Sequence, residues 1–158
     1  MPLSAHVRRC ALSAWLLLSV AGAAQAACSV QATPLAFGNY SPVSTSPTQS
    51  VGTVTVRCAT LLGLNLSYTI ALSAGMSGNP GNRYLSSGSA NLRYQLYQDA
   101  AGSIPWGDGS SGTTPLTDRQ LLVLLGTGKS YSIYGRIMAR QNVPPGTYQD
   151  TIVVTVTY

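Results

Sequence analysis

The 158-residue sequence lacks glutamate altogether and has one histidine and four aspartates. Ser-His-Asp or Cys-His catalysis and histidine metal sites cannot be built from this set, because His6 lies in the expected leader described below. Aspartates could still supply a carboxylate pair for glycoside hydrolysis. However, Asp108, Asp118 and Asp150 occupy turn or strand-edge settings, where aspartate usually makes local hydrogen bonds. We therefore expect no enzyme, no cofactor and no metal site.

Charge is also scarce, since only 8% of the residues are Asp, Glu, Lys or Arg. Seven basic and four acidic residues remain after the expected leader, a balance of +3. A nucleic-acid-binding surface would need basic residues clustered on one face or along one segment. Here they are scattered, and we expect no nucleic-acid partner: Arg57, Arg83, Arg93, Arg119, Lys129, Arg136 and Arg140.

Residues 1–26 have the pattern of a secretory signal peptide. A basic start is followed by an apolar core over 11–23 and by an A-x-A cleavage site at 24–26. The apolar run is shorter than the roughly 20 residues of a transmembrane helix, so we expect no membrane-spanning segment. Gln25 stands where a lipoprotein signal usually carries leucine, which argues against lipidation. Residues 27–158 then form one domain of ordinary size.

Cleavage would remove Cys10 and leave Cys28 and Cys58, an even pair in an exported chain. Such a pair predicts one disulfide, because exported proteins fold in an oxidising compartment. The loop of about 30 residues that it closes corresponds to roughly 3 to 4 kcal/mol of stabilisation by chain entropy. Two buried free thiols are the alternative.

After Cys28 the sequence consists of short alternating runs separated by Gly, Pro, Ser and Asn, with no sustained helical periodicity. This pattern predicts an all-β sandwich of about seven strands. The clearest runs cover 53–58, 66–74, 92–97, 131–138 and 151–158. The apolar run 121–125 predicts a strand that is buried on both faces.

The last run has an apolar face and no strand after it. Ile152, Val154, Val156 and Tyr158 alternate with polar residues or Val153, which is typical of a strand buried on one side. An open edge of this kind exposes hydrogen-bonding groups as well as apolar surface. We therefore predict that this strand is completed by a partner.

Aromatic residues suggest a second candidate site. Trp106, Tyr97 and Tyr134 could form a sugar-stacking surface. We favour packing instead, because tyrosine is common in strands and because a tryptophan inside the Gly- and Ser-rich segment 100–114 indicates an ordered loop. Arg136 and Asp150 could also form a surface ion pair, worth about 0 to 1 kcal/mol.

Several short motifs occur in a specific order after the first cysteine of the expected domain. They are 36–40 (AFGNY), 94–97 (YQLY), 106–109 (WGDG), 134–137 (YGRI), 145–151 (PGTYQDT) and 153–158 (VVTVTY). Together they resemble the spore coat protein U domain family, which includes the pilin subunits of archaic chaperone-usher pili. The resemblance extends over residues 28–158.

The resemblance implies an incomplete immunoglobulin-like sandwich that lacks its final strand, with Cys28 and Cys58 linking the first two strands. It also implies three partners: a periplasmic chaperone that lends a strand, an outer-membrane usher that exchanges it, and neighbouring pilin subunits. The expected product is a fibre at the cell surface that serves adhesion or biofilm formation. Ile152, Val154, Val156 and Tyr158 would form one side of the strand-complementation groove.

One feature departs from the family pattern. Polymerising pilins carry a donor extension before the first cysteine, whereas the expected cleavage leaves only Ala27 there. This departure favours a terminal subunit or a non-polymerising extracellular coat protein over a repeating shaft subunit. A small carbohydrate-binding module is a further alternative.

Overall fold

The computed structural model describes residues 27–59, 65–121 and 128–158. These residues form eight strands and one short 3₁₀ turn, η1 (Gly75–Ser77). The strands are β1 (Ala27–Thr33), β2 (Thr48–Ala59), β3 (Asn65–Leu72), β4 (Tyr84–Ser87), β5 (Ala90–Tyr97), β6 (Leu116–Leu121), β7 (Gly128–Ile137) and β8 (Val154–Thr157). The expected leader lies outside the described residues, as does most of the apolar run 121–125. Within the described ranges, no helix has the length and hydrophobicity needed to cross a bilayer.

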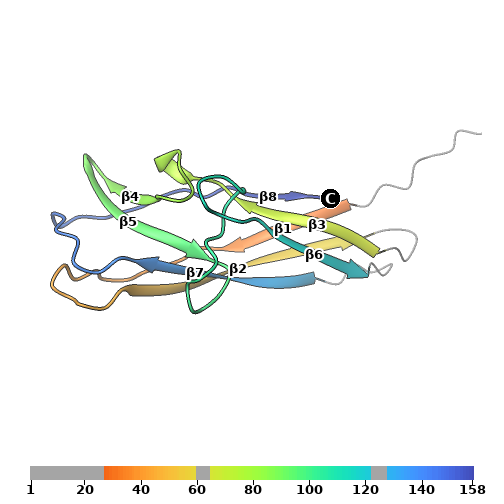
Figure 1. Ribbon diagram of the computed structural model, residues 1–158, viewed down its shortest axis with the longest axis horizontal. Coiled ribbons are helices and arrows are strands. Elements are labelled where there is room, and N and C mark those ends of the chain that lie inside the picture. Colours follow the sequence, from red (N-terminus) through yellow and green to blue (C-terminus); the bar gives the residue numbers. More distant parts are fainter. Residues whose placement is uncertain (1–26, 60–64, 122–127) are drawn as a thin grey trace, which may run out of the picture.

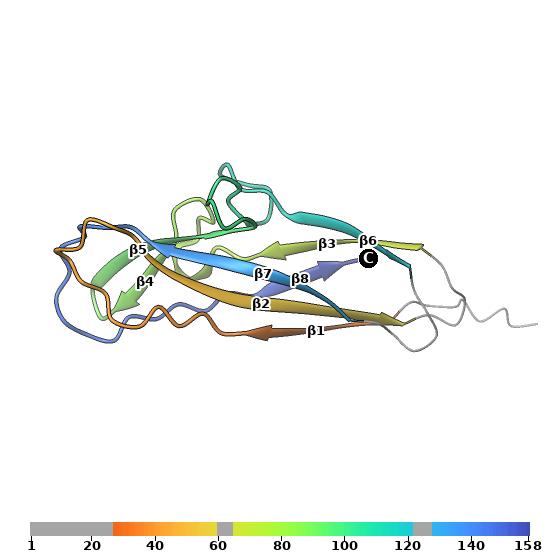
Figure 2. The ribbon, with the colours of Figure 1, turned by 90° about the horizontal axis from the view of Figure 1, so that it is seen from below.

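The strands form two sheets packed face to face, and both views show them running along the long axis of the molecule (Figures 1 and 2). One sheet has the order β1-β2-β7-β5-β4 and the other has the order β6-β3-β8. The predicted all-β sandwich is therefore confirmed. Its eight strands exceed the expected seven because residues 84–97 form a hairpin of β4 and β5. Gly88 turns this hairpin with φ +59°, a conformation that glycine adopts without steric cost.

The core lies between the sheets and contains the residues that the sequence alternation predicted. Each of the main strands contributes every second residue, and these side chains are at most 4% exposed. They include Val54, Val56 and Cys58 of β2, Tyr68, Ile70 and Leu72 of β3, Leu92, Tyr94 and Leu96 of β5, and Ile133 and Ile137 of β7. The period-2 pattern thus correctly assigned the buried face of four strands.

Cys28 and Cys58 are disulfide-bonded, as predicted. They lie directly opposite each other in the β1–β2 ladder, with their Cα atoms 4.0 Å apart. Since β1 pairs with β2 alone, the bond fastens the outermost strand of the larger sheet to its single neighbour.

The predicted strand over 151–158 is shorter in the structure. Only 154–157 join β3, with Leu72 opposite Val154. Before that point the chain crosses between the sheets: Gln149 bridges Ser86 of β4, and the carbonyl of Val153 accepts a hydrogen bond from the amide of Ser73. Along this crossing the backbone forms hydrogen bonds first with β4 and then with the segment after β3. A regular ladder with β3 therefore begins only at Val154.

Candidate functional site

Two neighbouring strand edges lack a hydrogen-bonded partner among the described residues. β1 pairs only with β2, and β8 pairs only with β3. The two strands run antiparallel to each other on the same side of the sandwich, and the C-terminus lies at the end where β1 begins (Figures 1 and 2). They belong to different sheets and form no ladder with each other. The sandwich is therefore open along this side.

Inward-facing side chains on β1 are exposed, so no segment of the described chain covers this opening. Val30 lies opposite Val56 in the ladder and shares its face of the sheet. Val56 is 0% exposed, whereas Val30 is 37% exposed. The next inward residue, Ala32, is also exposed although its partner Val54 is fully buried. The larger sheet thus presents apolar surface at its edge, where a further strand would cover it.

A hollow of about 340 Å³ lies between the end of β1 and the beginning of β8. Its walls are the segments 32–37 and 150–154, which come from the two ends of the domain. Apolar side chains from three other strands form its floor: Leu85, Leu96 and Ile133. The hollow is therefore lined mainly by hydrophobic side chains on both walls and floor.

A second hollow of about 650 Å³ adjoins the first. It lies between the segments 35–42 and 143–150. The two hollows share Leu35, Phe37, Leu85 and Asp150, so they are sections of one groove. We refer to the section lined by 32–37 and 150–154 as the proximal hollow, and to the other as the distal hollow.

Two glycines on the inner face of the larger sheet hold one wall of the groove in place. A Cβ on Gly135 would lie 2.5 Å from Leu35 Cδ2 and 2.7 Å from Phe37 Cζ, and a Cβ on Gly52 would lie 2.9 Å from Leu35 Cδ1. The missing side chains at these strand positions let Leu35 and Phe37 pack directly on the sheet. Phe37 also meets the ring of Tyr94 edge-on, with centroids 6.0 Å apart.

The backbone of this wall has free hydrogen-bonding capacity. Within the described chain, residues 34–40 make no backbone–backbone hydrogen bonds. The segment is held instead by its side chains and by Ser50 Oγ, which donates to the carbonyl of Ala36 at 2.8 Å. Unpaired backbone groups beside an apolar hollow are the features that an added strand uses for binding.

Asp150 stands where the two hollows meet. Its carboxylate accepts hydrogen bonds from the Tyr94 hydroxyl at 2.7 Å, from the Met76 amide at 2.8 Å and from the Thr151 amide at 2.7 Å. Burial, and then the hydrogen bond to Asp150, raise the pKa of Tyr94. Tyr94 therefore stays a neutral donor in the floor of the groove.

The four predicted groove residues contribute unequally. Ile152 and Val154 line the proximal hollow. Val156 is half-buried and pairs with Ile70, and Tyr158 is 55% exposed. Neither Val156 nor Tyr158 belongs to the lining of the two hollows. Sequence alternation missed the opposite wall, Leu35 and Phe37, because 34–40 is not a strand and has no period of two.

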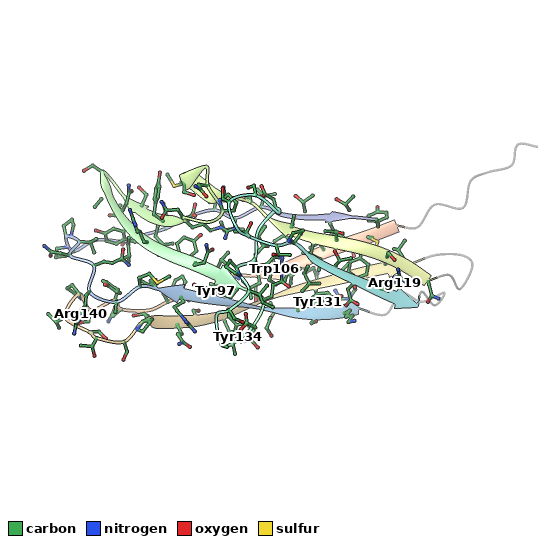
Figure 3. All side chains as sticks on the ribbon, viewed as in Figure 1. Tyr97, Trp106, Arg119, Tyr131, Tyr134 and Arg140 are labelled. Carbon is green, nitrogen blue, oxygen red and sulfur yellow. A yellow bond between two sulfur atoms is a disulfide. The ribbon has the colours of Figure 1, made fainter. Side chains whose placement is uncertain are left out.

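Of the three residues of the possible ligand surface, Trp106 is buried, whereas Tyr97 and Tyr134 are partly exposed. Trp106 is 0% exposed, and its Nε1 donates to the carbonyl of Ile70 at 2.9 Å. Its indole therefore fills the core and anchors the loop after β5. Figure 3 shows where the side chains of Trp106, Tyr97 and Tyr134 lie on the ribbon. Tyr97 and Tyr134 are half-buried and lie directly opposite each other in the β5–β7 ladder.

Arg83 is a buried residue that the sequence analysis did not single out. It is 0% exposed, and its guanidinium donates to the Gln95 side chain and to the carbonyls of Leu72, Ser73, Pro80 and Trp106 at 2.7 to 3.2 Å. Burial lowers its pKa. The sequence offers one signal, namely that Arg83 lies two residues before the inward-facing Leu85 and so falls on the apolar face.

The remaining aspartates have local partners. Asp99 accepts hydrogen bonds from Ser103 and Ile104, and Asp108 accepts hydrogen bonds from Ser110, as expected for turn residues.

The ion pair between Arg136 and Asp150 is not formed, because Arg136 donates to the carbonyls of loop residues 100 and 101. Among the described residues, no three or more His, Cys, Asp or Glu side chains gather where they could hold a metal ion.

Asp118 belongs to a polar chain that connects the two sheets. It accepts a hydrogen bond from the Tyr131 hydroxyl at 2.7 Å and pairs with Lys129 at 2.5 Å. The hydroxyls of Tyr131 and Tyr68 also contact each other. The hydrogen bond with Lys129, and then that with Tyr131, lower the pKa of Asp118, whereas burial raises the pKa of Tyr131.

Comparison with known proteins gives a consistent result. A family model described as Spore Coat Protein U domain matches residues 14–155. The chain is 34% identical over 134 residues to Protein U of Myxococcus xanthus, which covers 78% of this chain and 71% of that protein.

Among solved structures, the chain is similar to one in the CsuC–CsuE chaperone–tip adhesion subunit pre-assembly complex, from the archaic chaperone-usher Csu pili of Acinetobacter baumannii. The TM-score is 0.59 at 24% identity, with 85% of this chain and 40% of that chain covered. This likeness indicates a shared fold, and the present chain spans less than half the length of that structural relative.

Proposed function

Because the chain belongs to the spore coat protein U domain family, we propose that it is an exported structural subunit of a chaperone-usher type surface fibre, completed by a strand from another chain. The observation that carries this proposal is the open groove between β1 and the C-terminal segment. Its two walls offer unpaired backbone groups, and its floor offers apolar side chains. An added strand would use both.

Completion of the sandwich by an added strand would be driven by the same terms as folding, namely burial of apolar surface and backbone hydrogen bonding. A strand laid into the groove would cover apolar side chains such as Val30, Ile152 and Val154, at roughly 25 cal/mol for each Å² removed from water. The backbone of 34–40 and the free edge of β8 would supply hydrogen bonds on either side of that strand. Close packing along the whole groove would make dissociation slow. No chemical step is required, so the proposed role is not enzymatic.

The partners follow from this role. A periplasmic chaperone would occupy the groove first, an outer-membrane usher would mediate its replacement, and a neighbouring subunit would supply the final strand. The subunit would pass through the periplasm to the cell surface, where the fibre would serve adhesion or biofilm formation. The structural neighbour from the chaperone–tip adhesion subunit complex supports this assignment through its fold.

Substitution within β8 tests the proposal. Val154 lines the proximal hollow, so Val154→Asp would place a charge against the incoming strand. Thr155→Asp is the matched control, because Thr155 is the next residue of β8 and faces solvent. We expect the Val154 variant to lose co-purification with its chaperone and incorporation into surface fibres, while the Thr155 variant keeps both. Normal assembly of Val154→Asp would refute the assignment of the groove.

A non-polymerising extracellular coat protein is the second candidate. It is favoured by the description of the family model and by the 34% sequence identity to Protein U. Thermal unfolding of the purified domain separates the two roles. A domain that melts more sharply and at higher temperature with a donor peptide of alternating apolar residues has an incomplete sheet. A domain whose melting is unchanged by the peptide closes its own sheet and favours the coat role.

A further inference from the structure

Among the described residues that line the proximal and distal hollows, Asp150 is the sole charged one. It belongs to the lining of both, at the point where they meet. The residues around it are mainly apolar, including Leu35, Phe37 and Leu85. A strand that fills the groove therefore passes a single half-buried carboxylate between two apolar sections.

The hydrogen bonds of Asp150 leave one acceptor position open. An ionised carboxylate has about four lone-pair sites. The amides of Met76 and Thr151 donate to Oδ1, and the Tyr94 hydroxyl donates to Oδ2. Oδ2 can thus accept one more hydrogen bond within the described structure. All three existing donors are neutral groups, so none of them supplies a positive charge to the carboxylate.

No basic side chain of the described chain pairs with this carboxylate. Arg83 is near enough for its charge to interact with Asp150, but its hydrogen bonds go to carbonyls and to Gln95. The salt bridge found among the described residues joins Lys129 to Asp118 and does not involve Asp150. When a strand covers the groove, water leaves Asp150 and the charge loses part of its solvation.

We propose that the strand accepted by this groove carries a lysine or arginine opposite Asp150, with an apolar side chain two residues before it and another two residues after it. This inference rests on the proposed function. Side chains two residues apart on a strand face the same way, about 6.6 Å apart. The flanking apolar residues would then enter the proximal and distal hollows, while the basic residue meets Asp150. A polar contact of this kind fixes the register of the inserted strand.

Three synthetic peptides that differ at one position test the inference. All have the same length and the same alternating apolar residues, and the central inward position is lysine, norleucine or aspartate. Norleucine keeps most of the lysine stem and removes the charge. We expect the lysine peptide to bind the purified domain about tenfold more tightly than the norleucine peptide. Hydrogen bonds between charged groups contribute more binding free energy than neutral ones, and norleucine cannot form one. The aspartate peptide should bind most weakly.

Two variants identify the group that is responsible. In Asp150→Asn the lysine and norleucine peptides should bind with about the same affinity. Asp99→Asn removes a carboxylate that lies outside both hollows, so the preference for lysine should persist in that variant. Urea unfolding of both variants establishes that each is folded before binding is measured.

The outcomes separate the inference from the proposed function. Equal binding of the lysine and norleucine peptides, or a lysine preference that survives in Asp150→Asn, would overturn the inference and leave strand completion standing. Binding of none of the three peptides would overturn both.

Discussion

The disulfide between Cys28 and Cys58 should be the largest single covalent contribution to the stability of the isolated domain. It closes a loop with a sequence separation of 30. Chain-entropy bookkeeping converts a loop of this length into about 3.7 kcal/mol at 25 °C, acting mainly on the unfolded state. Domains of this size have a total free energy of unfolding of about 5 to 15 kcal/mol. Loss of the bond should therefore remove a large fraction of the stability.

The effect should be strongest in β1, because this strand has one hydrogen-bonded neighbour and an uncovered inner face. Without the bond, only the ladder with β2 retains it. The end of β1 contributes Ala32 and Thr33 to one wall of the groove, so its fraying should weaken donor-peptide binding beyond the loss in global stability. Hydrogen exchange should speed up more at the amides of β1 than at those of β7, which has neighbours on both sides.

Urea unfolding of the oxidised and the dithiothreitol-reduced domain measures this contribution directly. We expect the midpoint to fall by an amount equivalent to about 3 to 4 kcal/mol. A Cys28→Ala/Cys58→Ala variant is the control, since its unfolding should not respond to the reductant. A reduced domain less than about 1 kcal/mol weaker than the oxidised domain would refute the chain-entropy argument.

Two further predictions concern polar groups between the sheets. Arg83→Met should destabilise the domain by several kcal/mol, and Arg83→Lys by about 1 to 3 kcal/mol. Neither new side chain can replace every donor to the carbonyls around Arg83. Urea midpoints of the two variants near that of the wild type would contradict this prediction. Asp118 has a lowered pKa when folded, so the stability it provides is present above the unfolded value of about 3.9 and lost as the pH falls through the folded value. Asp118→Asn should therefore flatten the loss of stability below about pH 4, relative to the wild type. Equal slopes for wild type and Asp118→Asn would refute the assignment.

The alternation of apolar residues predicted most of the fold. Val54, Val56 and Cys58 share a face in the sequence and are buried together in the structure. The same holds for Tyr68, Ile70 and Leu72. A strand has a period of two whatever its neighbours, so its buried face can be read locally. The pairing of Cys28 with Cys58 was predictable for a different reason, because only two cysteines remain after the expected leader.

Position in space decided the site. Ile152 and Val154 were predictable from alternation, but the facing wall of Leu35 and Phe37 comes from a segment without strand periodicity, seated on Gly52 and Gly135. Such an arrangement depends on which strands become neighbours, and no local pattern encodes that.

The same reason explains why the roles of Arg83 and Asp150 were not predicted. The sequence by itself determined a disulfide-bonded β-sandwich with an apolar strand near its C-terminus, because cysteine content and alternation can be read without knowing which segments meet. Only the tertiary structure decided that Arg83 is enclosed by carbonyls and that Asp150 stands at the junction of an open groove. Each of these depends on contacts between segments far apart in the chain, which form only when the two sheets pack together.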